Sequence, residues 1–206
     1  MQFGIITLIL VIVTVLISMA AFRDPALTNK LILWPRRMDR PEEYYRLLTS
    51  GFIHADGTHL FFNMFTLFFI GSAVEQYFSL LSNGLLYLLL YLLGIVAASL
   101  PSFFRHRHNS YFRSLGASGG VAAVLFSMVY FAPWSGIYIF FIRMPSIVFA
   151  VLYLVYSMYM SRRGGDYINH DAHFWGAVFG FLFTLVISPD HGSFFIHQIM
   201  QPAWNQ

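Results

Sequence analysis

Ser118, which lies between glycines in the stretch SLGASGG, is the candidate nucleophile of this sequence. A serine hydroxyl attacks a carbonyl carbon when a base takes its proton, and a neutral imidazole is the usual base. The chain has no cysteine, and its single lysine, Lys30, lies in a polar connection. Thiolate catalysis and zinc–thiolate sites are therefore excluded. Because small residues also let membrane helices pack closely, the stretch alone fits either a packing motif or a catalytic one.

Three further polar side chains lie near the starts of long apolar runs: His59, Asn63 and His173. His173 is the candidate base for Ser118. His59 and Asn63 are four residues apart and share a helical face. Their side-chain N–H groups, with the Ser118 backbone N–H, suit the oxyanion of an acyl-transfer reaction. Asp171 is two residues from His173 and points to roughly the opposite side of a helix, so a Ser–His dyad is predicted rather than a triad.

Membrane-spanning helices must position these residues. Of the 206 residues, 58% are hydrophobic and only 10% are charged, which is too apolar for an ordinary soluble domain. The runs predict an all-α membrane protein with six transmembrane helices in one domain, residues 1–206. Arg143 and Pro145 interrupt the first half of the fifth run. The six predicted spans are 3–21, 58–78, 84–104, 116–132, a segment within 136–161, and 172–188.

The even-numbered spans should bring the four polar residues together. Consecutive spans alternate in direction, so the second, fourth and sixth enter the membrane from one side and place these residues at a similar depth. Gly176 and Gly180 follow His173 along one helical stripe, and glycines allow close helix approach. We expect this stripe to pack against a stripe of the fourth span consisting of Ser118, Val121, Ala122 and Leu125.

Three motifs resemble those of the rhomboid intramembrane serine proteases. They occur in the family's order, and their joint specificity is high. They are HLFFN at 59–63, similar to H-x-x-x-N; GASGG at 116–120, similar to G-x-S-G; and AHFWGAVFG at 172–180, similar to A-H-x-x-G-x-x-x-G.

The resemblance covers a core of about residues 44–188. Residues 45–75 are similar to the family's first loop and second helix, including His54, Gly71 and Glu75. Two positions depart from the family. Tyr45 stands where a tryptophan often precedes the arginine, and Ala122 stands where an aromatic residue often stacks on the catalytic histidine. Phe126, one turn further on, is the candidate replacement for that aromatic ring.

The resemblance implies a six-helix rhomboid-like bundle that hydrolyses a peptide bond in or near a transmembrane segment of another membrane protein. It also implies that Ser118 is the nucleophile and His173 the base. The oxyanion hole would consist of His59, Asn63 and the Ser118 amide, with water entering through a cavity open to one face. The implied partners are transmembrane protein substrates and the lipid bilayer, and no cofactor or metal is expected.

The orientation in the membrane is predicted differently by two arguments. The connections on the active-site side carry eleven of the twelve lysines and arginines, whereas the other side carries only Arg143. The positive-inside rule places the side with more lysines and arginines, here the active-site side, in the cytoplasm. The resemblance to six-span bacterial members implies the reverse, an inner-membrane protein with its active site toward the periplasm, and we adopt that expectation.

Two alternative functions remain at this stage. The first is a catalytically silent rhomboid-like protein that binds membrane clients, although such proteins usually lack the serine or the histidine. The second is a metal-dependent membrane hydrolase or transporter, but the spacing of its candidate ligands matches no standard zinc motif and the sequence has no H-E-x-x-H. Scattered arginines do not predict nucleic-acid binding, and nothing indicates an oligomeric state. The candidate metal ligands are His54, Asp56, His59, His170, Asp171 and His173.

Overall fold

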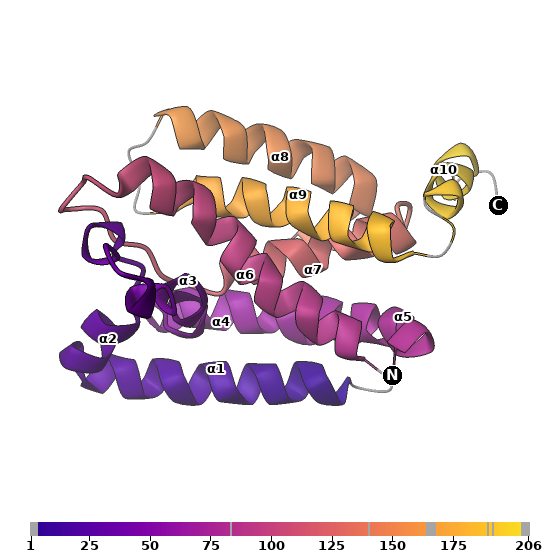
Figure 1. The fold of residues 1–206 in the computed structure, drawn as a ribbon. Coiled ribbons are helices and arrows are strands. Elements are labelled where there is room, and N and C mark those ends of the chain that lie inside the picture. Colours follow the sequence, from indigo (N-terminus) through magenta and orange to yellow (C-terminus); the bar gives the residue numbers. More distant parts are fainter. Residues whose placement is uncertain are drawn as a thin grey trace.

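The computed structural model describes residues 4–82, 84–139, 141–163, 168–188, 190 and 192–202, and these are mostly helical (Figure 1). Two elements are continuous with α4: a π-helical turn, η4, and then α5. The long helices and the C-terminal helix are α1 (Ile5–Arg23), α4 (Gly57–Thr66), η4 (Leu67–Gly71), α5 (Ser72–Ser82), α6 (Leu85–His106), α7 (Ser118–Phe131), α8 (Ser146–Arg163), α9 (His170–Ile187) and α10 (Ser193–Met200).

Four helical segments of the described chain are long and apolar enough to cross a membrane: α1, the continuous Gly57–Ser82, α6 and α9. The predicted count of six spans is therefore not reached on these criteria. The helix α7 is apolar but has only 14 residues, about 21 Å at 1.5 Å per residue against a hydrocarbon core of about 30 Å. The helix α8 has 18 residues but is less apolar.

The fifth span was predicted somewhere within 136–161, and α8 occupies the second part of that range. In its first part the strands β1 (Gly136–Ile139) and β2 (Ile142–Pro145) pair antiparallel, with Tyr138 opposite Arg143. Pro145 ends the second strand and α8 begins at the next residue. A proline fixes its own φ and suits an element boundary.

The helix α7 lies in the centre of the bundle (Figure 1). Every residue from Gly119 to Ser127 is buried, and a helix that is apolar on all sides belongs in a protein interior. Small residues bring its neighbours close: a Cβ at Gly119 would overlap Ala98 of α6, and one at Gly94 would lie 2.7 Å from the Ala123 Cβ. The short central helix is therefore surrounded by protein rather than by lipid.

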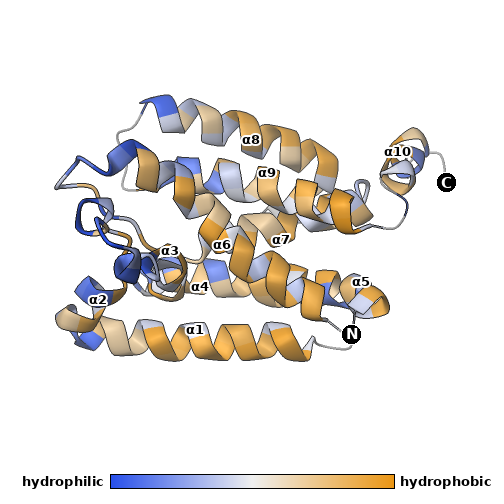
Figure 2. Cartoon of the chain, viewed as in Figure 1, coloured by the Kyte–Doolittle hydropathy of each residue, from blue (hydrophilic) through white to orange (hydrophobic). Residues whose placement is uncertain are grey.

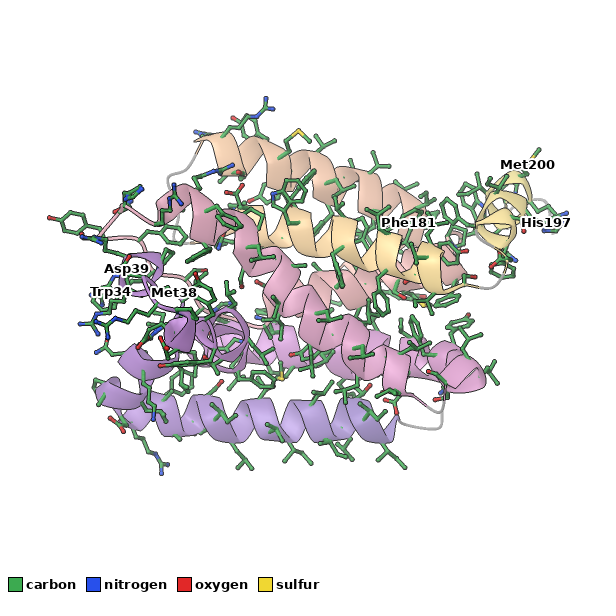
Figure 3. The ribbon with its side chains drawn as sticks, viewed as in Figure 1. Trp34, Met38, Asp39, Phe181, His197 and Met200 are labelled. Atoms are coloured by element: carbon green, nitrogen blue, oxygen red, sulfur yellow. The ribbon has the colours of Figure 1, made fainter. Side chains whose placement is uncertain are left out.

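Polar residues gather at one end of the bundle, where the connection between α1 and α4 folds (Figure 2). The Arg46 guanidinium, 5% exposed, donates to the carbonyls of Asn29 (2.7 Å) and Ile32 (3.1 Å) and pairs with Glu43. Trp34, Met38 and Asp39 lie at this end and His197 and Met200 at the other (Figure 3). The connection is thus folded at one end of the bundle. Its elements are α2 (Pro25–Leu31), η1 (Pro35–Arg37), η2 (Pro41–Glu43), α3 (Arg46–Thr49) and η3 (Ser50–Phe52).

Candidate active site

A cavity of about 1000 Å³ opens at the start of α7. All four candidate residues line it: His59 and Asn63 from α4, Ser118 from α7, and His173 from α9. His59 and His173, which are 114 positions apart along the chain, therefore line the same cavity. The common depth inferred from the alternating span directions agrees with this arrangement.

Ser118 is the first residue of α7, and the backbone before it is constrained. The N-cap residue, Ala117, makes no side-chain cap hydrogen bond, and the first bond back along the helix runs from the Val121 N–H to the Ala117 carbonyl (2.9 Å). The N–H groups of a helix's first turn have no intrahelical acceptor and carry the positive end of its dipole. The start of α7 can therefore donate to a developing oxyanion.

Gly116 cannot be replaced without strain. Its φ is +121°, a region that side chains rarely adopt, and a Cβ there would lie 2.6 Å from the His59 Cε1 atom. This glycine lets the chain turn into α7 while the His59 ring packs directly against the turn. Gly116, two residues before Ser118, therefore has a conformational role at the entry to α7.

The contact between α7 and α9 runs along a different stripe of α7 from the predicted one. A Cβ at Gly176 would overlap the Gly119 carbonyl, and one at Gly180 would overlap the Ala123 carbonyl. One turn further, the hydroxyls of Thr184 and Ser127 are 2.8 Å apart. The glycines of α9 do bring the two helices together, as expected. The residues of α7 that contact α9 are Gly119, Ala123 and Ser127. Ser118 lies beside this contact stripe.

Tyr153 of α8 packs on the His173 ring, with ring centroids 6.0 Å apart and planes 23° apart. This contact was not predicted from the sequence, because the start of α8 could not be located from the apolar run alone. Phe126, the expected replacement, instead packs against Tyr153 at 5.7 Å. Phe149 and Tyr153, four residues apart, both line the cavity. That spacing of aromatic residues is the signal in the sequence that could have suggested the role.

Asn169 is a second residue near the site that was not predicted from the sequence. Its Oδ1 accepts the Ala172 N–H (3.2 Å) and thereby caps α9. Its Nδ2 donates to the hydroxyls of Ser114 (2.9 Å) and Ser102 (3.0 Å). The residue thus links the start of α9, which carries His173, to α6 and to the loop that precedes Ser118. An Asn shortly before an apolar helical run is a recognisable N-cap signal.

Asp171 faces away from a triad role. Its carboxylate pairs with Arg105 of α6 and accepts a hydrogen bond from the Ser161 hydroxyl of α8. Those partners occupy both of its oxygens. The partners of Asp171 are therefore Arg105 and Ser161, and the Ser118–His173 dyad stays a prediction.

Local hydrogen bonds fix the start of α4 and the side chain of Asn63. The Asp56 side chain accepts the backbone N–H of His59 (2.8 Å) and caps the helix. Asn63, 6% exposed, donates one amide N–H to the His59 carbonyl (3.0 Å). An Asn amide has two N–H donors, so the second can serve the cavity while the first fixes the side chain.

His54 supports the backbone beside the nucleophile. Its Nε2 accepts the Ala117 N–H (3.2 Å), and its Nδ1 lies 2.9 Å from the Ser18 hydroxyl, which donates to the Phe52 carbonyl (3.0 Å). This pattern requires a neutral ring with its proton on Nδ1. Burial, followed by the nearby His59, lowers the pKa of His54 to about 3. This supporting role of His54 was not predicted; the sequence suggested the residue only through the family resemblance and as a candidate metal ligand.

The candidate metal ligands do not converge. Within the described part of the chain, no three His, Asp or Glu side chains lie close enough to hold a metal ion. His54 instead binds Ser18 and Ala117, and Asp171 binds Arg105 and Ser161. The geometry therefore gives the metal-dependent alternative no support.

Comparison with known proteins identifies relatives of this chain. The sequence model of the Rhomboid domain matches residues 41–190. RHOMBOID-like protein 4 of Arabidopsis thaliana is 32% identical over 161 residues, which cover 76% of this chain and 38% of the relative. RHOMBOID-like protein 12, mitochondrial, of the same plant is 29% identical, covering 65% and 43%. Rhomboid protease GluP of Bacillus subtilis (strain 168) is 29% identical, covering 74% and 28%. The chain thus spans less than half the length of each of these relatives.

Proposed function

Because this chain belongs to the rhomboid family of integral membrane proteins, we propose that it is an intramembrane serine endopeptidase. Its substrates would be membrane proteins, cleaved in or near a transmembrane segment. The observation that carries the proposal is the convergence of Ser118, His173, His59 and Asn63 on one cavity at the start of α7. A further support is that one of the relatives is named a protease.

In the proposed reaction His173 takes the Ser118 proton as the hydroxyl attacks the scissile carbonyl carbon. The resulting oxyanion accepts hydrogen bonds from His59, Asn63 and the Ser118 backbone N–H. His173 then gives its proton to the leaving amine, and an acyl-enzyme remains on Ser118. Water entering through the cavity hydrolyses the acyl-enzyme, with His173 acting again as the base.

The proposed domain is a single unit over residues 1–206 with six membrane spans. Besides the four long apolar segments, α7 would be a short span inside the bundle and α8 a peripheral one. Exposed aliphatic and aromatic residues on α8 support lipid contact. They include Val151, Leu152, Val155 and Tyr156.

For orientation we retain the proposal that the Ser118 face points away from the cytoplasm. The relatives come from a plant as well as a bacterium, so they do not indicate a bacterial inner membrane in particular. The absence of cysteine allows a direct test with single cysteines at Tyr111, 94% exposed on the active-site side, and Phe141, 98% exposed on the other. A membrane-impermeant maleimide applied to intact cells should label the first only, and the reverse pattern would support the positive-inside argument.

Cleavage by purified protein tests the main proposal. A substrate with a helix-destabilised transmembrane segment should be cut by the wild type, whereas Ser118→Ala or His173→Ala should abolish cleavage. A fluorophosphonate probe should label Ser118 in a His173-dependent manner. Unchanged cleavage in Ser118→Ala would exclude the mechanism. Binding of the segment without cleavage or labelling would favour the silent, client-binding alternative.

A further inference from the structure

The Trp34 ring holds two arginines at the polar end of the bundle, where Figure 3 labels this tryptophan. The Cζ atoms of Arg37 and Arg113 lie 3.9 and 3.8 Å from the ring centroid. An indole face attracts guanidinium groups through its quadrupole. The indole N–H donates to the Ser110 carbonyl (3.3 Å). One side chain therefore gathers a cation from each of two loops.

Neither of these cations is neutralised by a described carboxylate. The ion pairs among the described residues are Arg36 with Asp39, Arg46 with Glu43, and Arg105 with Asp171. Arg37 and Arg113 are both exposed, and both lie on one ring, within about one Debye length of each other. An anion bound beside either guanidinium would lower their mutual repulsion. A single guanidinium offers the paired N–H donors that a carboxylate accepts best.

Arg113 also lines the cavity that contains Ser118. The backbone between the two residues is held in place: Ser114 and Leu33 exchange two backbone hydrogen bonds of 3.1 Å, and the Gly116 N–H donates to the Ser50 carbonyl (2.9 Å). Five residues of extended chain span at most about 18 Å. A ligand that reached both Ser118 and Arg113 would therefore place its anionic group within about five extended residues of its reacting bond.

We infer that Arg113, held with Arg37 on Trp34, selects substrates that carry an Asp or Glu within about five residues of the scissile bond. The inference rests on the proposed protease function and names a specificity determinant for it. A substrate carboxylate is favoured over a lipid phosphate, because Arg113 lines the same cavity as the nucleophile. A lipid headgroup would approach from outside the bundle.

The test uses one transmembrane substrate with Asp, Asn or Lys at each position near the cleavage site. In neutral detergent the wild type should cleave the best Asp substrate about tenfold more efficiently than its Asn form, mainly through a lower KM, as one charge-assisted hydrogen bond would produce. Arg113→Gln should remove the preference for Asp over Asn, and Arg37→Gln should weaken that preference. Arg113→Glu should instead favour the Lys substrate. An unchanged Asp preference in Arg113→Gln would overturn the inference.

Arg36→Gln is the matched control, because Arg36 is adjacent to Arg37 but pairs with Asp39 and does not line the cavity. It should keep the wild-type preference. Fluorophosphonate labelling of Ser118 should be equal in all these variants, which separates substrate selection from damage to the catalytic dyad. If Arg113→Gln lowered the cleavage efficiency equally for the Asp, Asn and Lys substrates, the inference would be contradicted.

Two further experiments test whether Arg113 binds lipid instead of substrate, and whether substrate selection persists without cleavage. In vesicles of phosphatidylcholine with or without phosphatidylglycerol, an Arg113→Gln effect that depended on the anionic lipid but not on substrate charge would assign the site to lipid and overturn the inference. Binding of Asp and Asn substrates to Ser118→Ala gives a readout without turnover. Tighter binding of the Asp form, lost in Arg113→Gln, would uphold the selection even if the wild type cleaved nothing and the proposed protease function failed.

Discussion

The ring of Tyr153 lies nearly parallel to that of His173, with centroids 6.0 Å apart, so that α8 supplies a wall for the candidate base on α9. The two helices run side by side, with α9 between α8 and α6 (Figure 1). Tyr153 in turn contacts Phe126 of α7, at 5.7 Å. The orientation of the base therefore depends on the packing of three helices.

Removing the Tyr153 ring should slow catalysis. An aromatic pair contributes about 0.5–1.5 kcal/mol beyond buried area, so Tyr153→Leu should lower kcat by up to about tenfold, while Tyr153→Phe should remain near wild type. Single-turnover kinetics and the pH profile of kcat are the measurements. Equal losses in both variants would show that the hydroxyl, rather than the ring, is what His173 requires.

Acidification should destabilise the protein through His54. An unfolded histidine titrates near pH 6.5, and the folded pKa of His54 is about 3, so between these values the unfolded chain binds a proton that the folded chain does not. The free energy of unfolding therefore rises with pH in this window and falls on acidification, by up to about 1.4 kcal/mol per pH unit. Protonation of His54 at Nε2 would also remove the acceptor of the Ala117 N–H hydrogen bond.

His54→Gln should flatten this dependence, because a Gln oxygen can accept the Ala117 N–H without titrating. Thermal unfolding in detergent between pH 4 and 7 measures it. His108→Gln, at an exposed position, is the matched control and should keep the wild-type slope. A wild-type slope in His54→Gln as well would disprove the assignment.

Adding a single methyl group at Gly176 should separate α7 from α9. The new Cβ would overlap the Gly119 carbonyl, and overpacking typically costs about 1–3 kcal/mol. Gly176→Ala should lower the unfolding temperature and reduce Ser118 labelling. Gly57→Ala is the control, because a Cβ there meets nothing within 4 Å. Equal stability of both variants would mean that the helices shift apart at little cost.

Glu75 should affect stability without affecting Ser118 chemistry. Its carboxylate, 6% exposed, accepts the N–H groups of Ile6 (3.0 Å) and Thr7 (2.7 Å), and so caps the start of α1 from another helix. Glu75→Ala should lower the free energy of unfolding by about 1–3 kcal/mol. At low temperature, Ser118 labelling should persist. Glu42→Ala, at an exposed position, should change neither quantity.

The sequence alone determined the class of protein and predicted that its candidate site residues lie together. Apolar runs of membrane length specify helices, because the bilayer offers no other partner for backbone groups. The alternation of spans then places His59, Asn63, Ser118 and His173 near one face. Composition, spacing and motif order were sufficient for this much, and the family match agrees with it.

The rotation and length of each helix were decided by the tertiary structure. Glycines on α9 indicated close packing, but only the combined fit of three helices placed 119, 123 and 127 of α7 on the contact line, with Ser118 beside it. Burial on all sides removes the amphipathic pattern from which a rotation could be read. Likewise β2 ends at Pro145, directly before α8, and the position of α8 brings Tyr153 to His173. These relations depend on contacts between residues distant in sequence, which no local pattern encodes.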